Sequence, residues 1–156
     1  MEDLVELRKR VMFKGKEKVA DAIRIFADNW NIPLDQVTVG GGAALVLRGI
    51  REETHDLNLW VDSPHFEKLC EEMKTINHPM TDTVIMMPNV FTYVRQRNRY
   101  FEHDVIAGIQ VFNVLALIVQ KRGGYAEHAR PVAKRKQDRM DLRILAEIHA
   151  QRNKVA

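Results

Sequence analysis

Hydrophobic and polar positions follow two periods along this chain, and the changes between them predict a mixed α/β fold. Over residues 2–29 apolar side chains recur every three or four positions, which predicts one amphipathic helix or two, with Gly15 as the point of interruption. Residues 37–39 and 56–61 instead follow the two-residue period of strands. Between these strands the run at 43–47 is short and apolar, so we expect a buried helix there.

The second half of the chain repeats this mixture of periods. Ser63 and the proline that follows it are typical of a helix start, and the alternation before and after residue 97 predicts a β-hairpin. A turn is expected directly after that hairpin, and two helices close the chain. The elements expected here are a helix at 64–75, a strand at 83–87, hairpin strands at 90–96 and 99–106, a turn at 108–111, and helices at 112–122 and 136–152.

Length and composition predict one domain with an N-terminal helical segment at 1–30, a core at 37–111 and C-terminal helices at 112–153. The chain has 156 residues, of which 46% are hydrophobic and 29% charged, as in ordinary globular proteins. The expected fold is α/β (α+β), a small mixed β-sheet with flanking helices. We predict no membrane span, and the first residues lack a signal-peptide pattern. The single cysteine, Cys70, fits a buried position in a reducing cytoplasm, so a cytoplasmic location is expected.

The charge balance permits a nucleic-acid partner without requiring one. The formal net charge is +3, and basic side chains gather at residues 8–18 and 134–143. These two faces are either solvated surface or a stripe that binds RNA or another partner. Oligomeric state is left open by this pattern.

Three consecutive glycines and two polar strand positions form the candidate chemistry. Gly40, Gly41 and Gly42 stand between a strand and a helix, where backbone N–H groups can approach a phosphate. Asp56 and Asn58 are two residues apart on a strand, so both side chains project from one face, as oxygen ligands of Mg²⁺ would. The alternatives are that the glycines only allow close packing and that Asp56 caps a backbone group or pairs with an arginine.

The stretch from Val37 to Asp62 resembles the nucleotidyltransferase superfamily, which has a polymerase-β-like fold. The likeness is strongest to the minimal enzymes and to the toxin-type members of abortive-infection systems. Residues 134–142 are similar to the Arg-x-Lys-Asp-x-x-Asp-Leu signature that closes the same family, so the likeness spans about residues 37–148. The matching positions near the glycines are Gly40, Gly41, Gly42, Ala44, Leu45, Gly49, Arg51, Thr54 and Asp56. Two positions depart from the family pattern: Arg51 lies one residue further from Asp56 than usual, and Asn58 replaces the second carboxylate.

The resemblance implies a set of roles for individual residues. Asp56, Asn58 and a third carboxylate on an adjacent strand would hold Mg²⁺ on a nucleoside triphosphate. Asp104 is the expected third ligand, with Glu102 as the alternative. The glycines would cradle the phosphates, and Thr54 would hydrogen-bond the glycine loop or a phosphate. The side chains expected to balance phosphate charge are Arg51, Lys121 and Lys136.

Two functions follow from this resemblance. The first is Mg²⁺-dependent transfer of a nucleotide from a nucleoside triphosphate to a hydroxyl group on RNA, a protein or a small molecule. The second is a weakened or inactive nucleotidyltransferase-like protein that binds a nucleotide, a nucleic acid or a protein partner. Asn58 separates them, because an amide still ligates Mg²⁺ but lacks the negative charge of a carboxylate.

Overall fold

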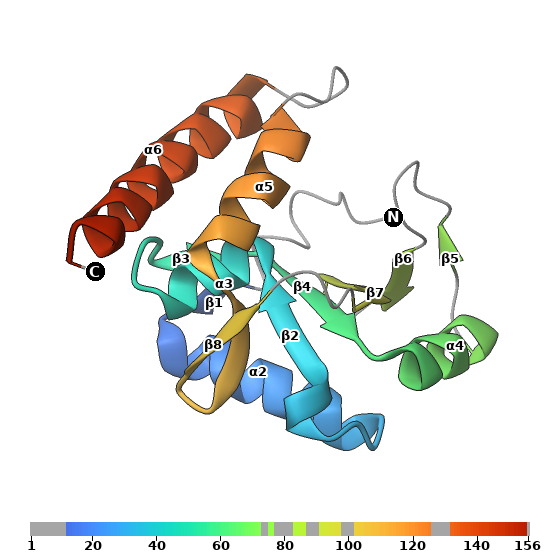
Figure 1. The fold of residues 1–156 in the computed structure, drawn as a ribbon. Helices are drawn as coiled ribbons and strands as arrows, with labels where there is room; N and C mark the ends of the chain where they lie inside the picture. The colour runs from blue at the N-terminus through green and yellow to red at the C-terminus, as the bar shows by residue number, and fades with distance from the viewer. Residues whose placement is uncertain are drawn as a thin grey trace.

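A central mixed β-sheet organises the computed structural model, which describes residues 12–72, 75–76, 83–86, 91–97, 102–125 and 132–155 (Figure 1). Within these residues the sheet has seven strands in the order β5-β6-β7-β4-β2-β9-β8. This arrangement confirms the expected α+β fold with helices at the C-terminus. The strands are β2 (Val37–Gly40), β4 (Asp56–Val61), β5 (Thr75–Ile76), β6 (Thr83–Met86), β7 (Phe91–Gln96), β8 (His103–Ile106) and β9 (Ile109–Phe112).

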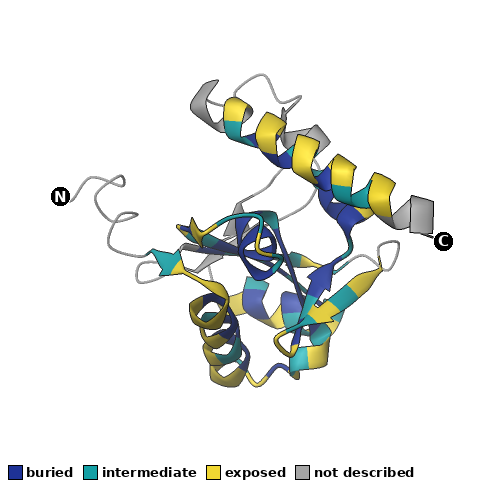
Figure 2. Cartoon of the chain, turned by 90° about the vertical axis from the view of Figure 1, so that its left-hand side faces the viewer, coloured by how far each residue is buried: buried dark blue, intermediate teal, exposed yellow. Residues whose placement is uncertain are grey.

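Helices cover the sheet, and two short strands form a separate ribbon beside it. The ribbon pairs β1 (Phe13–Lys14) with β3 (Glu53–Thr54) in antiparallel orientation. Figure 1 and Figure 2 place α2 and α6 at opposite ends of the molecule, with the sheet between them. The helices are α2 (Lys16–Asn29), α3 (Gly41–Leu47), α4 (Ser63–Glu72), α5 (Val114–Tyr125) and α6 (Val132–Val155), with a 3₁₀ turn, η1, at Leu34–Gln36.

The hydrophobic core lies where α2 and α3 pack against the central strands. The buried stripe of α2 includes Val19 and Ile23, both fully buried, while its outer face is exposed (Figure 2). All but the first residue of α3 are buried, which explains why this helix is apolar on every side. From β4, Leu57 and Leu59 enter the same core at 1% and 0% exposure. This packing anchors both ends of the glycine turn.

The predicted hairpin of residues 90–96 and 99–106 is wrong. β7 runs parallel to β4 over six residue pairs and antiparallel to β6, so both of its edges are occupied. β8 instead forms a hairpin with β9. Their two-residue connection, Ala107 and Gly108, has positive φ at both positions, as tight hairpins require. The expected turn at 108–111 is therefore mostly strand.

Helix boundaries also differ from the sequence prediction. Residues 13–14 are strand, and α2 begins only after Gly15, whose φ of 88° lies outside the helical region; residues 1–11 lie outside the described part. The helix expected at 64–75 ends at Glu72. At the C-terminus α5 continues through the two glycines at 123 and 124, and α6 begins at Val132 rather than 136.

The two C-terminal helices pack against each other and against the core (Figure 1). On α6, Leu145 is fully buried, and two acidic side chains, Asp138 and Asp141, are buried at 1% and 0% exposure. On α5, Leu115 remains half exposed. Among the described helices, none combines the length and the apolar character needed to cross a membrane.

Candidate functional site

The polar face of β4 carries the candidate site. Along this strand, buried residues alternate with half-buried ones, which confirms the predicted two-residue period. Asp56, Asn58 and Trp60 share the half-buried face. Thr54, in the preceding strand β3, is 3% exposed, and its hydroxyl donates to the main-chain oxygen of Asp56 at 3.2 Å. Thr54 thus holds the start of β4 beside the glycine turn.

Each of the three glycines faces a different side chain of the β3–β4 segment. A Cβ atom on Gly40 would lie 2.7 Å from Cζ3 of Trp60. On Gly41, whose φ is +58°, it would lie 2.8 Å from Nδ2 of Asn58. On Gly42 it would lie 2.7 Å from Oγ1 of Thr54, so all three positions exclude a larger side chain. Close packing therefore accounts for the glycine run, and phosphate binding by it stays a prediction.

Arg95 is a functional candidate that the sequence analysis missed. It lies on β7 in register with Trp60, and its Nη1 donates to Oδ1 of Asn58 at 3.0 Å. Its guanidinium carbon is 5.1 Å from the Trp60 ring centroid, within range of a cation–π contact. In the structure, Thr92 and Val94 are buried and alternate with half-buried Tyr93 and Arg95. In the sequence, the same alternation along the predicted strand at 90–96 was the signal that could have placed Arg95 on a partly exposed face.

The positive charge of Arg95 lies in a partly buried environment. Burial lowers the pKa of Arg95, while the negative charge of Asp56 and the phenol of Tyr93 act in the opposite direction. In the described part of the chain, no carboxylate oxygen lies within 4.0 Å of its guanidinium. The partner in hydrogen-bonding contact, Asn58, is neutral. The partly desolvated guanidinium thus contacts a neutral amide and an aromatic ring. The negative charge of Asp56, which favours the charged form of Arg95, lies farther away.

Asp104, the predicted third metal ligand, lies far from Asp56. The strand order places β2 and β9 between β4 and β8, so three strand spacings, about 14 Å, separate the two strands. Asp104 forms an ion pair with Arg48, whose Nη2 is 2.6 Å from Oδ2. Glu102 immediately precedes β8 and is equally removed. The prediction that this strand adjoins β4 is wrong, because β7 takes that place.

Two of the predicted phosphate-binding cations are neutralised inside the protein. Arg51 Nη2 lies 3.0 Å from Oδ2 of Asp141, and Lys121 Nζ lies 3.1 Å from the same oxygen. Lys121 also contacts Oδ1 of Asp138 at 3.0 Å. Lys136, by contrast, is exposed on α6. The buried acids of α6 therefore fasten this helix to the core beside the glycine turn.

The residues predicted to hold Mg²⁺ do not assemble into one site. The side-chain oxygen of Asn58 accepts from Arg95, and Asp104 is three strands away. Among the described residues, no group of three His, Cys, Asp or Glu side chains is placed to hold a metal ion. A guanidinium next to Asp56 would also repel a dication. Asp56 and Asn58 share one face of β4 as predicted and Asp104 does not join them, so Mg²⁺ binding by Asp56 and Asn58 stays a prediction.

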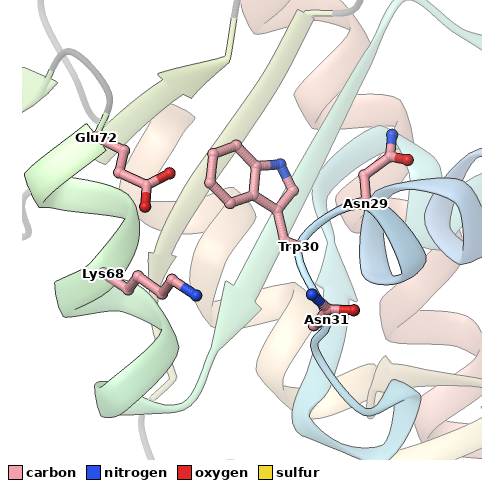
Figure 3. A pocket seen from close by; sticks show the side chains of 5 residues that line it. All are labelled: Asn29, Trp30, Asn31, Lys68 and Glu72. Carbon is pink, nitrogen blue, oxygen red and sulfur yellow. The ribbon is translucent and has the colours of Figure 1, made fainter.

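Two hollows are described on the molecule, and neither is lined by Asp56, Asn58 or Arg95. The larger, about 460 Å³, lies between the end of α2 and α4. Figure 3 shows Lys68 and Glu72 of α4 extending toward Trp30 across this hollow. No residue predicted for the site contributes to it.

The two stretches that carried the resemblance to nucleotidyltransferases, residues 37–62 and 134–142, meet in space. Arg51 joins them, because its guanidinium lies against Gly42 and pairs with Asp141 of the C-terminal motif. Lys121 completes the contact from α5. No protein-family model matches the chain, and no curated protein matches it significantly.

Proposed function

We propose that this protein binds the phosphate groups of a nucleotide on the polar face of β4, with Arg95 as the anchoring cation. Arg95 carries the proposal, because it is a partly desolvated guanidinium whose hydrogen-bonded partner is a neutral amide. Buried charges in proteins are normally paired or metal-bound. A phosphate oxygen would supply an opposite charge in direct contact, which among the described residues only the more distant Asp56 offers.

The chemistry of the guanidinium favours phosphate over other anions. Its planar donors match two phosphate oxygens at once, whereas Asn58 engages only one of its nitrogens. At an effective dielectric of about 20 and a separation of about 4 Å, each added negative charge contributes about 4 kcal/mol of gross attraction. Desolvation of the phosphate offsets much of this. The remainder is enough to order a phosphate at a half-buried cation.

The carboxylate of Asp56 limits which chemical groups of the ligand can lie next to it. This carboxylate shares the face with Asn58 and accepts hydrogen bonds but repels phosphate. We propose that a hydroxyl group, such as one from a ribose, donates to Asp56 while the phosphate contacts Arg95. A nucleotide carries both groups close together, in keeping with the likeness to nucleotidyltransferases.

Nucleotide transfer to an acceptor hydroxyl is the second candidate function. The observation favouring it is Asp56 itself, a half-buried carboxylate beside the phosphate position and the family's motif residue. RNA, a protein or a small molecule could provide the acceptor.

Calorimetric titration of the four nucleoside triphosphates, with and without Mg²⁺, tests the proposal. We expect binding that persists without Mg²⁺ and weakens at least tenfold in Arg95→Met. Arg24→Met is the matched control, because Arg24 is an exposed arginine on α2 whose side chain contacts Asp21 and the main-chain oxygen of Ala107. Equal binding by wild type and Arg95→Met would refute the role of Arg95.

Asn58→Asp provides a second arm. In this structure the new carboxylate would lie about 3 Å from the guanidinium and form an ion pair with it. We therefore expect weaker nucleotide binding, not a gain of metal-dependent activity. Incorporation of labelled nucleotide by wild type, lost in Asp56→Asn, would establish transfer in place of simple binding.

A further inference from the structure

A basic hollow lies where β1, α2 and the end of α3 meet, away from Arg95. Its volume is about 430 Å³, within the range of small-ligand pockets. Three cationic side chains and one acidic side chain line it, together with two glycines and one valine. These residues are Lys14, Lys16, Arg51, Glu52, Gly15, Gly49 and Val46.

The two lysines give this hollow its positive charge. Arg51 is already paired with the buried Asp141, but Lys14 and Lys16 have no carboxylate oxygen within 4.0 Å in the described part of the chain. Lys16 lies over Gly49, since a Cβ atom there would be 3.7 Å from its Nζ. Glu52 offsets one charge, so a surplus of positive charge remains.

The backbone shapes the hollow for a ligand. Gly15 and Gly49 both have positive φ, at 88° and 77°, which lets the chain turn sharply at the two edges. Among the described residues, no heavy atom lies within 4 Å of the Cβ position on Gly15. The main-chain N–H of Gly15 donates to the carbonyl of Glu52 at 2.9 Å and fixes the two edges together.

The amino end of α2 adds to the same field. This helix has 14 residues, and its N-cap, Gly15, provides no side-chain hydrogen bond to the first turn. First-turn N–H groups of a helix lack intrahelical partners and favour an anion. These N–H groups add to the positive field of Lys14 and Lys16, and the site depends mainly on the two lysines.

We infer that this hollow is a second anion site that takes a phosphate group, in particular a diphosphate-sized one. Lys14 and Lys16 both line the hollow, and neither has a carboxylate partner among the described residues, so they offer two positive charges to a ligand with two phosphoryl groups. A volume of about 430 Å³ accommodates a ligand of that size. The inference is independent of the proposed nucleotide site, because it uses neither Arg95 nor Asp56.

Titration of inorganic pyrophosphate into the full chain at low ionic strength tests this inference. We expect the double variant Lys14→Gln, Lys16→Gln to bind at least tenfold more weakly, since two nearby charges are removed. Lys18→Gln is the matched control: Lys18 is also exposed on α2 but does not line the hollow. Glu52→Gln should bind several-fold more tightly.

Other outcomes of the same titration separate this site from that of Arg95. If pyrophosphate binding is lost in Arg95→Met but unchanged in the double lysine variant, the inference fails while the proposed function stands. If the lysine pair affects only a single-stranded oligonucleotide, and pyrophosphate does not bind, the small-anion site is refuted. Equal losses in Lys18→Gln and the double variant would show unspecific surface charge and refute it too. Far-ultraviolet circular dichroism and thermal unfolding confirm that each variant is folded.

Discussion

Replacing Gly40 by alanine is the most direct test of how the glycine turn is built. The new Cβ atom would lie 2.7 Å from Cζ3 and 3.1 Å from Cη2 of Trp60, about 1 Å inside ordinary carbon–carbon contact. Trp60 cannot move away freely, because its ring packs edge-on against Phe112 at 5.1 Å and lies under Arg95. Overpacking of this kind costs about 1–3 kcal/mol.

The backbone does not contribute to that cost. Gly40 has a φ of −130°, an extended conformation that alanine adopts without strain. Alanine also reduces the freedom of the unfolded chain, which stabilises by about 0.4–1 kcal/mol. We therefore expect a net loss of about 1–2 kcal/mol in the free energy of unfolding, measured by urea denaturation.

A double-mutant cycle with Trp60→Phe identifies the cause. Phenylalanine lacks the outer ring atoms that the new methyl group would meet, so Gly40→Ala should cost at least about 1 kcal/mol less in that background. The packing explanation is refuted if Gly40→Ala raises the free energy of unfolding, or lowers it equally with Trp60 and with Phe at position 60. Ligand binding would then be the remaining explanation for the glycine.

Three further predictions address charges. Asp141→Asn should lower the free energy of unfolding by about 3–5 kcal/mol in urea, because it leaves Arg51 and Lys121 without their shared buried carboxylate; the exposed Asp21→Asn should cost less than about 1 kcal/mol. Asp104→Asn should leave nucleotide affinity unchanged in calorimetry, and a tenfold loss would contradict the strand order found here. Arg95→Lys should bind nucleotide progressively less well as pH rises into the alkaline range, because the burial that lowers the pKa of Arg95 also favours the neutral amine of a lysine there, which attracts no phosphate. A flat pH profile in that variant would show that the site is well solvated.

Local periodicity predicted the part of the site that lies close together in sequence. The alternation in β4 and the strand, turn and helix around Gly40 depend on neighbours within a few residues, so the strand at 37–39, the helix at 43–47 and the strand at 56–61 were predicted, whereas β3 at Glu53–Thr54 was not. The same range contains Thr54 and Asp56, which do meet. Patterns of this kind record which face of an element is buried.

Sheet order could not be predicted in the same way. The positions of Asp104 and Arg95 depend on which strand pairs with β4, and both β7 and β8 have sequences compatible with that place. Pairing is decided by contacts between residues more than 30 positions apart, which a two-residue period does not encode. The sequence analysis therefore placed a carboxylate where the structure has an arginine.

Helix ends beyond the core were predicted less well for a related reason. The glycines at 123 and 124 indicated a helix end, yet α5 continues to Tyr125 because its packing against α6 outweighs local propensity. The buried acids Asp138 and Asp141 belonged to a recognised motif, but only the structure shows them bound to Arg51 and Lys121.

The one-to-one matching of glycines to strand side chains has an evolutionary consequence. Because Gly40 meets Trp60 and Gly42 meets Thr54, volume at these places is shared between two distant positions. Among descendants of this chain, a larger residue at position 40 should arise only together with a smaller one at position 60, and likewise for 42 and 54. Such compensating pairs would preserve the turn through sequence drift.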